Sequence, residues 1–235
     1  LKAAPKMNCT LEFNRKLVRG TLYYHDNIDI SMPMILHNGE MMTVNMHNME
    51  NKSLSEMTDA LNDTIRRANN TDLNEVMFEV SMDNTIKGLK KGKVKQTIRR
   101  LYGSKMPGKH KVKTLSGREK KKYYSISKKD RLTKYDIEQG TTTISNIGSI
   151  GRTHKGTCYL LEIIPPQTTA FCIGAVQRKP WVVTDENGNE KIEIRSILPL
   201  TCAIDHRSLD YGDCVPMINR LNEIFNDPAV IQKWK

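Results

Sequence analysis

The sequence lacks the features that mark several classes of protein. It has no apolar run near the roughly 20 residues that cross a bilayer as a helix. Its first 16 residues contain no hydrophobic signal-peptide core. Its five cysteines are odd in number and form no CxxC pair, which argues against a disulfide framework and a zinc site. We therefore expect reduced structural thiols, no metal, no membrane association and a cytoplasmic location.

Acidic residues are scarce in one long segment. Residues 87–134 contain 19 lysines and arginines but only Glu119 and Asp130 as acids, so this segment carries +17 and the remainder −6 of the net +11. Its aromatic residues, Tyr102, Tyr123 and Tyr124, are too few and too scattered for a base-stacking platform. These observations argue against a nucleic-acid partner, and we expect mainly a solvated basic insertion at about 75–130.

The first third of the chain predicts strands followed by a helix. Residues 8–24 and 29–46 alternate apolar and polar positions, and Asn38-Gly39 is a strong hairpin signal. From Ser53 onward, a capping box with Glu56 precedes apolar residues at helical spacing. Residues 85–103 then favour a basic helix broken by glycines, and residues 104–124 a turn-rich, mobile surface segment.

The last third returns to regular patterns. Residues 156–183 and 190–205 predict strand-like runs joined by a turn at residues 185–188. Cys158, Cys172 and Cys202 lie in these runs, where a free thiol packs as a small hydrophobic side chain. Apolar spacing from Met217 to Phe225 predicts a final helix that stops at Asp227-Pro228. The order is α+β, and we expect one domain over 1–235 with a mixed sheet and helices on one face.

His206, in "CAIDHRSLDYGD", is the first candidate for chemistry. A histidine between a strand and a helix is held in place, and its near-neutral pKa suits a general base for a thiol or hydroxyl. Asp210 lies four residues on and could brace the backbone or pair with Arg207. The same residues also suit a polar turn at a helix N-terminus, where acids are favoured. The pattern alone leaves both readings open.

Ser145, in "GTTTISNIGSIG", is the second candidate. It interrupts an apolar β run, and its hydroxyl could bond to backbone or stabilise an oxyanion. The absence of a GxSxG elbow argues against a nucleophilic serine. The glycines at 148 and 151 allow close backbone approach but form no dinucleotide-binding fingerprint.

Three segments in order, "GTTTISNIGSIG", "IIPPQTTAFCIGAVQRKP" and "ILPLTCAIDHRSLDYGD", resemble the catalytic domain of dihydrolipoyl acyltransferases. These are the core subunits of 2-oxo acid dehydrogenase complexes and share a fold with chloramphenicol acetyltransferase. Residues 18–61 resemble the family's preceding strand–hairpin–helix segment. The resemblance covers about 1–70 and 133–231.

The resemblance implies CoA-dependent acyl transfer. His206 would be the general base, Ser145 would donate a hydrogen bond to the tetrahedral oxyanion, and Asp210 would support this geometry. The family works as trimers with active sites between subunits, so His206 would face Ser145 of a neighbour. The acyl group would pass between coenzyme A and a dihydrolipoyl thiol on a separate domain or protein.

Three departures from the family pattern affect these expectations. Tyr211 stands where the family usually has glycine directly after the aspartate, which puts the acceptor in doubt. The segment at 75–130 is longer and more basic than the family's connection, and it could dock an acidic lipoyl carrier or CoA phosphates. The family's N-terminal helix and first strands have no counterpart before Leu1, so we expect the chain to enter the domain partway through.

Two other function classes stay open. One is a stand-alone O- or S-acetyltransferase acting on a small molecule. The other is a non-catalytic scaffold or basic binding module, although a scaffold needs none of Ser145, His206 and Asp210.

Overall fold

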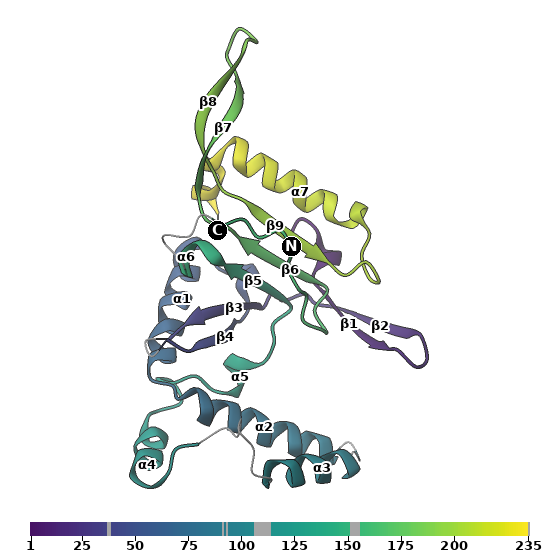
Figure 1. Cartoon of the computed structure of the whole chain (residues 1–235), viewed down its shortest axis with the longest axis vertical. Coiled ribbons are helices and arrows are strands. Elements are labelled where there is room, and N and C mark those ends of the chain that lie inside the picture. The colour runs from purple at the N-terminus through teal and green to yellow at the C-terminus, as the bar shows by residue number, and fades with distance from the viewer. Residues whose placement is uncertain (37–38, 91, 93, 106–113, 151–155, 235) are drawn as a thin grey trace.

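The computed structural model describes residues 1–36, 39–90, 92, 94–105, 114–150 and 156–234 (Figure 1). The strands are β1 (Cys9–Asn14), β2 (Arg19–Tyr24), β3 (Ile30–Ile35), β4 (Met41–Met46), β5 (Thr142–Asn146), β6 (Thr169–Ile173), β7 (Gln177–Thr184), β8 (Glu190–Ile197) and β9 (Leu200–Ile204). The α-helices are α1 (Leu54–Asn69), α2 (Leu73–Lys90), α3 (Val94–Lys105), α4 (Gly117–Ser125), α5 (Lys134–Ile137), α6 (Ile147–Ile150) and α7 (Tyr211–Asn226). Short 3₁₀ turns cover Pro5–Met7, Met49–Asn51 and Pro228–Lys233.

A mixed five-stranded sheet forms the centre of the molecule, as expected. Its order is β4-β3-β5-β6-β9, with parallel pairing of β3 with β5 and of β5 with β6, and antiparallel pairing at both edges. Two antiparallel ribbons, β1–β2 and β7–β8, project from this body in different directions (Figure 1). The expected α+β mixed-sheet architecture is therefore confirmed.

The predicted turns and caps are present in the described residues. Gly39 and Gly188 adopt φ angles of 81° and 83°, the left-handed region that favours glycine in hairpin turns. Asn38 of the first turn lies outside the described residues. The Ser53 hydroxyl accepts from the Glu56 N–H at 3.3 Å while Glu56 Oε2 accepts from the Ser53 N–H at 2.7 Å, which completes the capping box.

Helices α1 and α7 cover the same face of the sheet and leave an apolar cavity between them. Met57 of α1, Ile144 of β5 and Leu221 of α7 are among its lining residues, and its volume is about 860 Å³. Beneath α7, buried Met7, Cys9 and Met217 form one part of the core. A second core cluster joins β3 and β4 to α1 and α2.

The basic segment is more ordered than the sequence indicates. Helices α2 and α3 lie side by side at one end of the molecule (Figure 1), and α4 forms where we expected a mobile turn-rich segment. Helix α4 is held because Tyr123 is buried and Tyr124 donates to the buried Glu75. Residues 106–113 of the expected mobile segment lie outside the described residues.

Two smaller expectations are wrong. Residues 156–164 run along the molecule without joining a strand, so the apolar run expected at 156–183 forms β6 and β7 only in its second half. Cys202 is exposed, whereas Cys172 is buried as expected. Within the described ranges, no helix combines the length and apolar character required to cross a membrane.

Candidate active site

His206 lies in a tight turn that follows the edge strand β9. The Asp205 N–H donates to Thr168 O at 2.8 Å, and the Ser208 and Leu209 N–H groups both donate to Asp205 O. This turn directs His206 away from the core, and its side chain is 77% exposed.

The hydrogen bonding of His206 fixes which ring nitrogen can act as a base. Its Nδ1 lies 2.9 Å from Leu209 O. A carbonyl oxygen can only accept, so Nδ1 carries the proton in this contact and Nε2 keeps its free lone pair. An exposed Nε2 with a lone pair is the arrangement that a general base requires.

Asp210 faces the histidine and starts the last helix. Its Oδ1 lies 3.3 Å from His206 Nδ1, and its backbone N–H donates to Asp213 Oδ2 at 3.0 Å at the start of α7. The alternative pairing of Asp210 with Arg207 is not found. Arg207 binds Asp205 instead, with Nη2 2.6 Å from Oδ2, and this guanidinium lowers the pKa of the Asp205 carboxyl.

Ser145 lies near the end of the central strand β5. It is half-buried and pairs in register with Cys172 of β6. Its neighbour Ile144 lines the cavity beneath α1 and α7, so strand alternation turns Ser145 to the opposite face of the sheet. No hydrogen bond of its hydroxyl is found among the described residues, which leaves the hydroxyl able to donate to a bound group.

A single chain does not bring Ser145 and His206 together. Ser145 is level with Cys172, whereas Ile204, just before His206, is level with Thr169. The three residues from Thr169 to Cys172 amount to about 10 Å along the strands, and the intervening strand adds about 9 Å across the sheet. The two candidates therefore lie at different ends of the sheet, while His206 and Asp210 are in contact.

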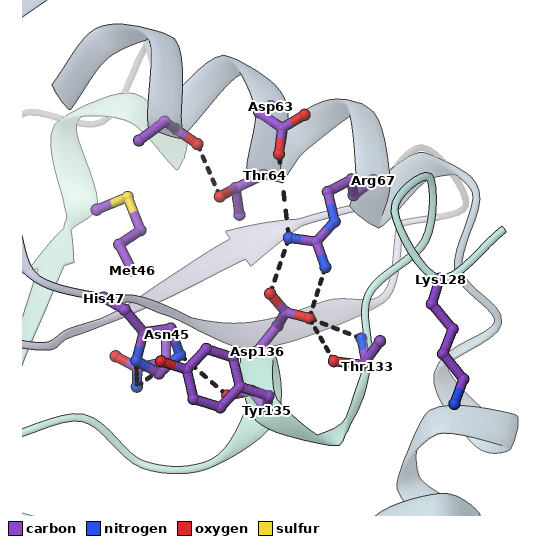
Figure 2. A pocket seen from close by; sticks show the side chains of 11 residues that line it. Asn45, Met46, His47, Asp63, Thr64, Arg67, Lys128, Thr133, Tyr135 and Asp136 are labelled. Atoms are coloured by element: carbon purple, nitrogen blue, oxygen red, sulfur yellow. Dashed lines mark hydrogen bonds and ion pairs between the residues drawn. The ribbon is translucent and has the colours of Figure 1, made fainter. Parts of the chain in front are cut away.

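A second, polar cleft lies between α1, β4 and α5 (Figure 2). In this cleft Arg67 forms two hydrogen bonds with Asp136, at 2.8 and 2.7 Å, and His47 stacks on Tyr135 with ring centroids 3.8 Å apart. No motif in the sequence indicated this cluster, because its members come from segments far apart in the chain. Since its charged groups mostly bind one another, we interpret it as a structural link between α1 and α5.

The described residues contain no group of three or more His, Cys, Asp or Glu side chains that could hold a metal ion. The five cysteines are free thiols. Burial raises the pKa of Cys9 and Cys214. These thiols are therefore largely protonated at neutral pH.

Curated proteins similar to this chain include acetyltransferase components of the pyruvate dehydrogenase complex. The chain is 38% identical over 78 residues to the dihydrolipoyllysine-residue acetyltransferase component of the pyruvate dehydrogenase complex of Mycobacterium tuberculosis, over 33% of this chain and 13% of that protein. It is 40% identical over 93 residues to the protein of the same name from Acholeplasma laidlawii, over 39% of this chain and 15% of that protein. The chain thus corresponds to a small part of these relatives.

Solved structures share the fold. A probable dihydrolipoamide acetyltransferase from Listeria monocytogenes superposes with a TM-score of 0.53 and 17% identity, covering 93% of this chain and 62% of that one. The dihydrolipoamide acetyltransferase of Azotobacter vinelandii gives a TM-score of 0.54 and 16% identity, covering 99% of this chain and 65% of that one.

A family model provides the assignment. The model of the 2-oxoacid dehydrogenases acyltransferase (catalytic domain) matches residues 110–232, just over half of the chain, including Ser145, His206 and Asp210. The chain therefore belongs to the 2-oxoacid dehydrogenase acyltransferase family, through its catalytic domain.

Proposed function

We propose that this chain carries the catalytic site of a CoA-dependent acyltransferase, which moves an acyl group between coenzyme A and a dihydrolipoyl thiol. The observation that carries the proposal is the hydrogen bond from His206 Nδ1 to Leu209 O, which leaves Nε2 available as a base on an exposed turn. The relatives' names, dihydrolipoyllysine-residue acetyltransferase, support the dihydrolipoyl group as the acceptor.

In the proposed reaction, His206 Nε2 takes the proton of the acceptor thiol as its sulfur attacks the thioester carbonyl of acyl-CoA. The carbonyl oxygen becomes an oxyanion, which accepts a hydrogen bond from the Ser145 hydroxyl. When the tetrahedral intermediate collapses, the bond to the CoA sulfur breaks and the CoA thiolate takes the proton from His206. Asp210, 3.3 Å from Nδ1, helps to hold the ring in place during the step.

The residue pattern of a structural relative supports these roles. In the Azotobacter vinelandii enzyme, a serine, a histidine and an asparagine four positions after that histidine were investigated for their role in the catalytic mechanism. His206 and Asp210 have the same spacing, with an aspartate in place of the asparagine.

We further propose a homotrimer in which His206 of one subunit faces Ser145 of the next. The separation of the two residues within one chain supports this arrangement, since both must reach one carbonyl group.

The β7–β8 ribbon supplies apolar surface for subunit contact, because Trp181, Ile192 and Ile194 are 56%, 75% and 65% exposed. Another structure with the same fold is the cubic core of the pyruvate dehydrogenase multienzyme complex, so higher assembly and complex subunits are the partners we propose. We propose a cytoplasmic location for this protein, because free thiols are typical of a reducing compartment.

Replacing the proposed base tests the function directly. The whole protein is assayed for acetyl transfer from acetyl-CoA to dihydrolipoamide, with CoA release as the readout. The rate should fall about 10²–10⁴-fold in His206→Ala. His25→Ala is the matched control, because the hydrogen bond of its imidazole within the described residues is to Thr10, beside the β1–β2 ribbon and outside the proposed site. Equal activity in wild type and His206→Ala would exclude His206 as the base.

The same assay addresses the alternative functions. Tyr211, 69% exposed at the first position of α7, is positioned to alter which acceptor enters. Transfer to small alcohols or thiols but not to dihydrolipoamide would favour a stand-alone acetyltransferase. Absence of transfer with several acyl-CoAs and acceptors would favour a non-catalytic scaffold.

A further inference from the structure

Two cysteines lie on the sheet face that carries Ser145. Cys172 is paired in register with Ser145 on one side and with Thr201 of β9 on the other. Paired residues of neighbouring strands point to the same face of a sheet, so the three side chains form a row. Cys172 is therefore the immediate neighbour of the proposed oxyanion donor.

Cys158 is fixed over this row by the segment that contains it. The Ala175 N–H donates to Gly156 O at 3.2 Å, and the Thr201 hydroxyl donates to Cys158 O. These bonds hold the segment against the ends of β6 and β9. Because Thr201 is also the strand partner of Cys172, the bond to Cys158 O places Cys158 beside Cys172.

The two thiols differ in accessibility. Cys172 is 1% exposed, and burial, reinforced by the contact with Cys158, raises its pKa to about 11. Cys158 is half-buried, and its Sγ donates to Leu160 O at 3.0 Å. An oxidant therefore reaches Cys158 first, and Cys172 is the neighbouring thiol that can close a bond to it.

We propose that Cys158 and Cys172 form a redox-active dithiol beside Ser145, which small-molecule disulfides oxidise to an intramolecular disulfide. The Cys158 thiolate attacks one sulfur of the small disulfide, forms a mixed disulfide and releases one thiol. The Cys172 thiolate then attacks the Cys158 sulfur and releases the second thiol. Two protein thiols are oxidised, and one small disulfide is reduced to two thiols.

Oxidation should slow acyl transfer, an expectation that rests on the proposed function. A disulfide bond of about 2 Å draws Cys172 towards the segment that contains Cys158 and shifts the strand partner of Ser145. A dihydrolipoyl acceptor is itself a dithiol, so it can reverse the reaction and become the cyclic disulfide while the protein regains two thiols. The acceptor would thus reactivate the enzyme.

Peptide mapping tests the disulfide independently of activity. The protein is incubated with glutathione disulfide, its free thiols are alkylated, and its peptides are identified by mass spectrometry. A linked Cys158–Cys172 peptide that dithiothreitol removes is expected in wild type and in Cys202→Ser, the matched control, and is expected to be absent in Cys158→Ser. A glutathione adduct on Cys158 without the linked peptide, or no modification of either cysteine, would overturn the proposal.

An activity measurement tests the regulation. Oxidised wild type should start about tenfold slower, as a displaced oxyanion donor predicts, and should accelerate with a lag that shortens as dihydrolipoamide increases. Cys158→Ser should show no lag after the same treatment. A linked peptide without any lag would overturn the regulatory role. Inactivity of both reduced and oxidised protein would instead contradict the proposed acyl transfer, while the peptide result would stand.

Discussion

Ser145 is the residue whose role is best separated from folding. Its hydroxyl makes no hydrogen bond within the described part of the chain, so Ser145→Ala should leave stability almost unchanged. Loss of one oxyanion donor should lower kcat by about 10²–10³-fold with little effect on KM. Steady-state kinetics with acetyl-CoA and dihydrolipoamide, alongside thermal unfolding, would measure both quantities.

Thr143→Ala is the matched control on the same strand, because the Thr143 hydroxyl donates to Gln167 Oε1 at 2.7 Å and has no proposed catalytic role. It should lower stability and spare kcat. If Ser145→Ala instead changed stability and left kcat intact, Ser145 would be a structural residue.

At the residue scale, the sequence could predict candidate site residues, but not which ring nitrogen of His206 carries the proton. His206 and Asp210 were predicted by their position between a strand and a helix, together with the family resemblance. The proton on Nδ1 follows from a contact with Leu209 O, which depends on how the turn closes. The His47–Tyr135 stack was not predicted, because nothing local to either residue indicates the other.

Glu75 shows how one residue holds an element of the basic segment. It is fully buried, and its carboxylate accepts from the Leu115 N–H at 2.7 Å and from the Tyr124 hydroxyl at 2.9 Å. Glu75→Ala leaves these two donors without their partner and should lower the free energy of unfolding by about 1–3 kcal/mol. Denaturant unfolding measures this change, and faster hydrogen exchange should appear in α4.

Glu119→Ala provides the comparison, because Glu119 is an exposed acid on α4 itself. A surface substitution of this kind should change the free energy of unfolding by no more than about 0.5 kcal/mol. Equal losses in the two variants would show that Glu75 does not anchor α4.

Asp29, just before β3, binds residues that follow β4 through a carboxylate with a lowered pKa. Burial alone raises this pKa, but hydrogen bonds from the Asn48 N–H, the Asn27 amide and His47 outweigh it. Because the folded-state pKa lies below the unfolded one, this stabilisation is complete above the unfolded value of about 3.9 and is lost as pH falls through the folded pKa. Asp29→Asn should therefore be less stable than wild type at pH 7, with a difference that shrinks below about pH 4.

Urea unfolding at a series of pH values measures this trend. Asp59→Asn, on the exposed side of α1, is the control and should follow wild type throughout. A stability difference between Asp29→Asn and wild type that stays constant down to pH 2 would contradict the role of the Asp29 charge.

At the element scale, local signals were sufficient where the structure is local. The capping box at Ser53, the turn at Gly188 and the stop at Asp227 were each read from adjacent residues. Helix α4 was missed because its charged sequence suits a solvated loop, and its order depends on Glu75 more than 40 positions away. The run at 156–164 was expected to be a strand, but β-propensity does not decide whether a neighbouring strand is available for pairing.

For the whole molecule, the sheet register limits what one chain can do. Its alternation and pairing place Ser145 and His206 at different ends of the sheet, a result that no motif spacing could show. In a closed ring, a site between two subunits can bring Ser145 of one chain and His206 of the next to the same substrate. Such a site leaves His206 exposed in the isolated chain. The proposed trimer thus accounts for a catalytic histidine that lies outside the core.

Mixing two inactive variants tests this arrangement. Ser145→Ala retains His206, and His206→Ala retains Ser145, so one of the two interfaces between unlike subunits in a mixed trimer contains the intact pair. If equal amounts are unfolded and refolded together at random, about three quarters of the trimers are mixed and each has one intact site of three, which restores about a quarter of wild-type activity. If both residues acted within one chain, the mixture would remain as inactive as its components. Refolded wild type gives the reference activity, and light scattering of the same samples confirms that trimers have formed.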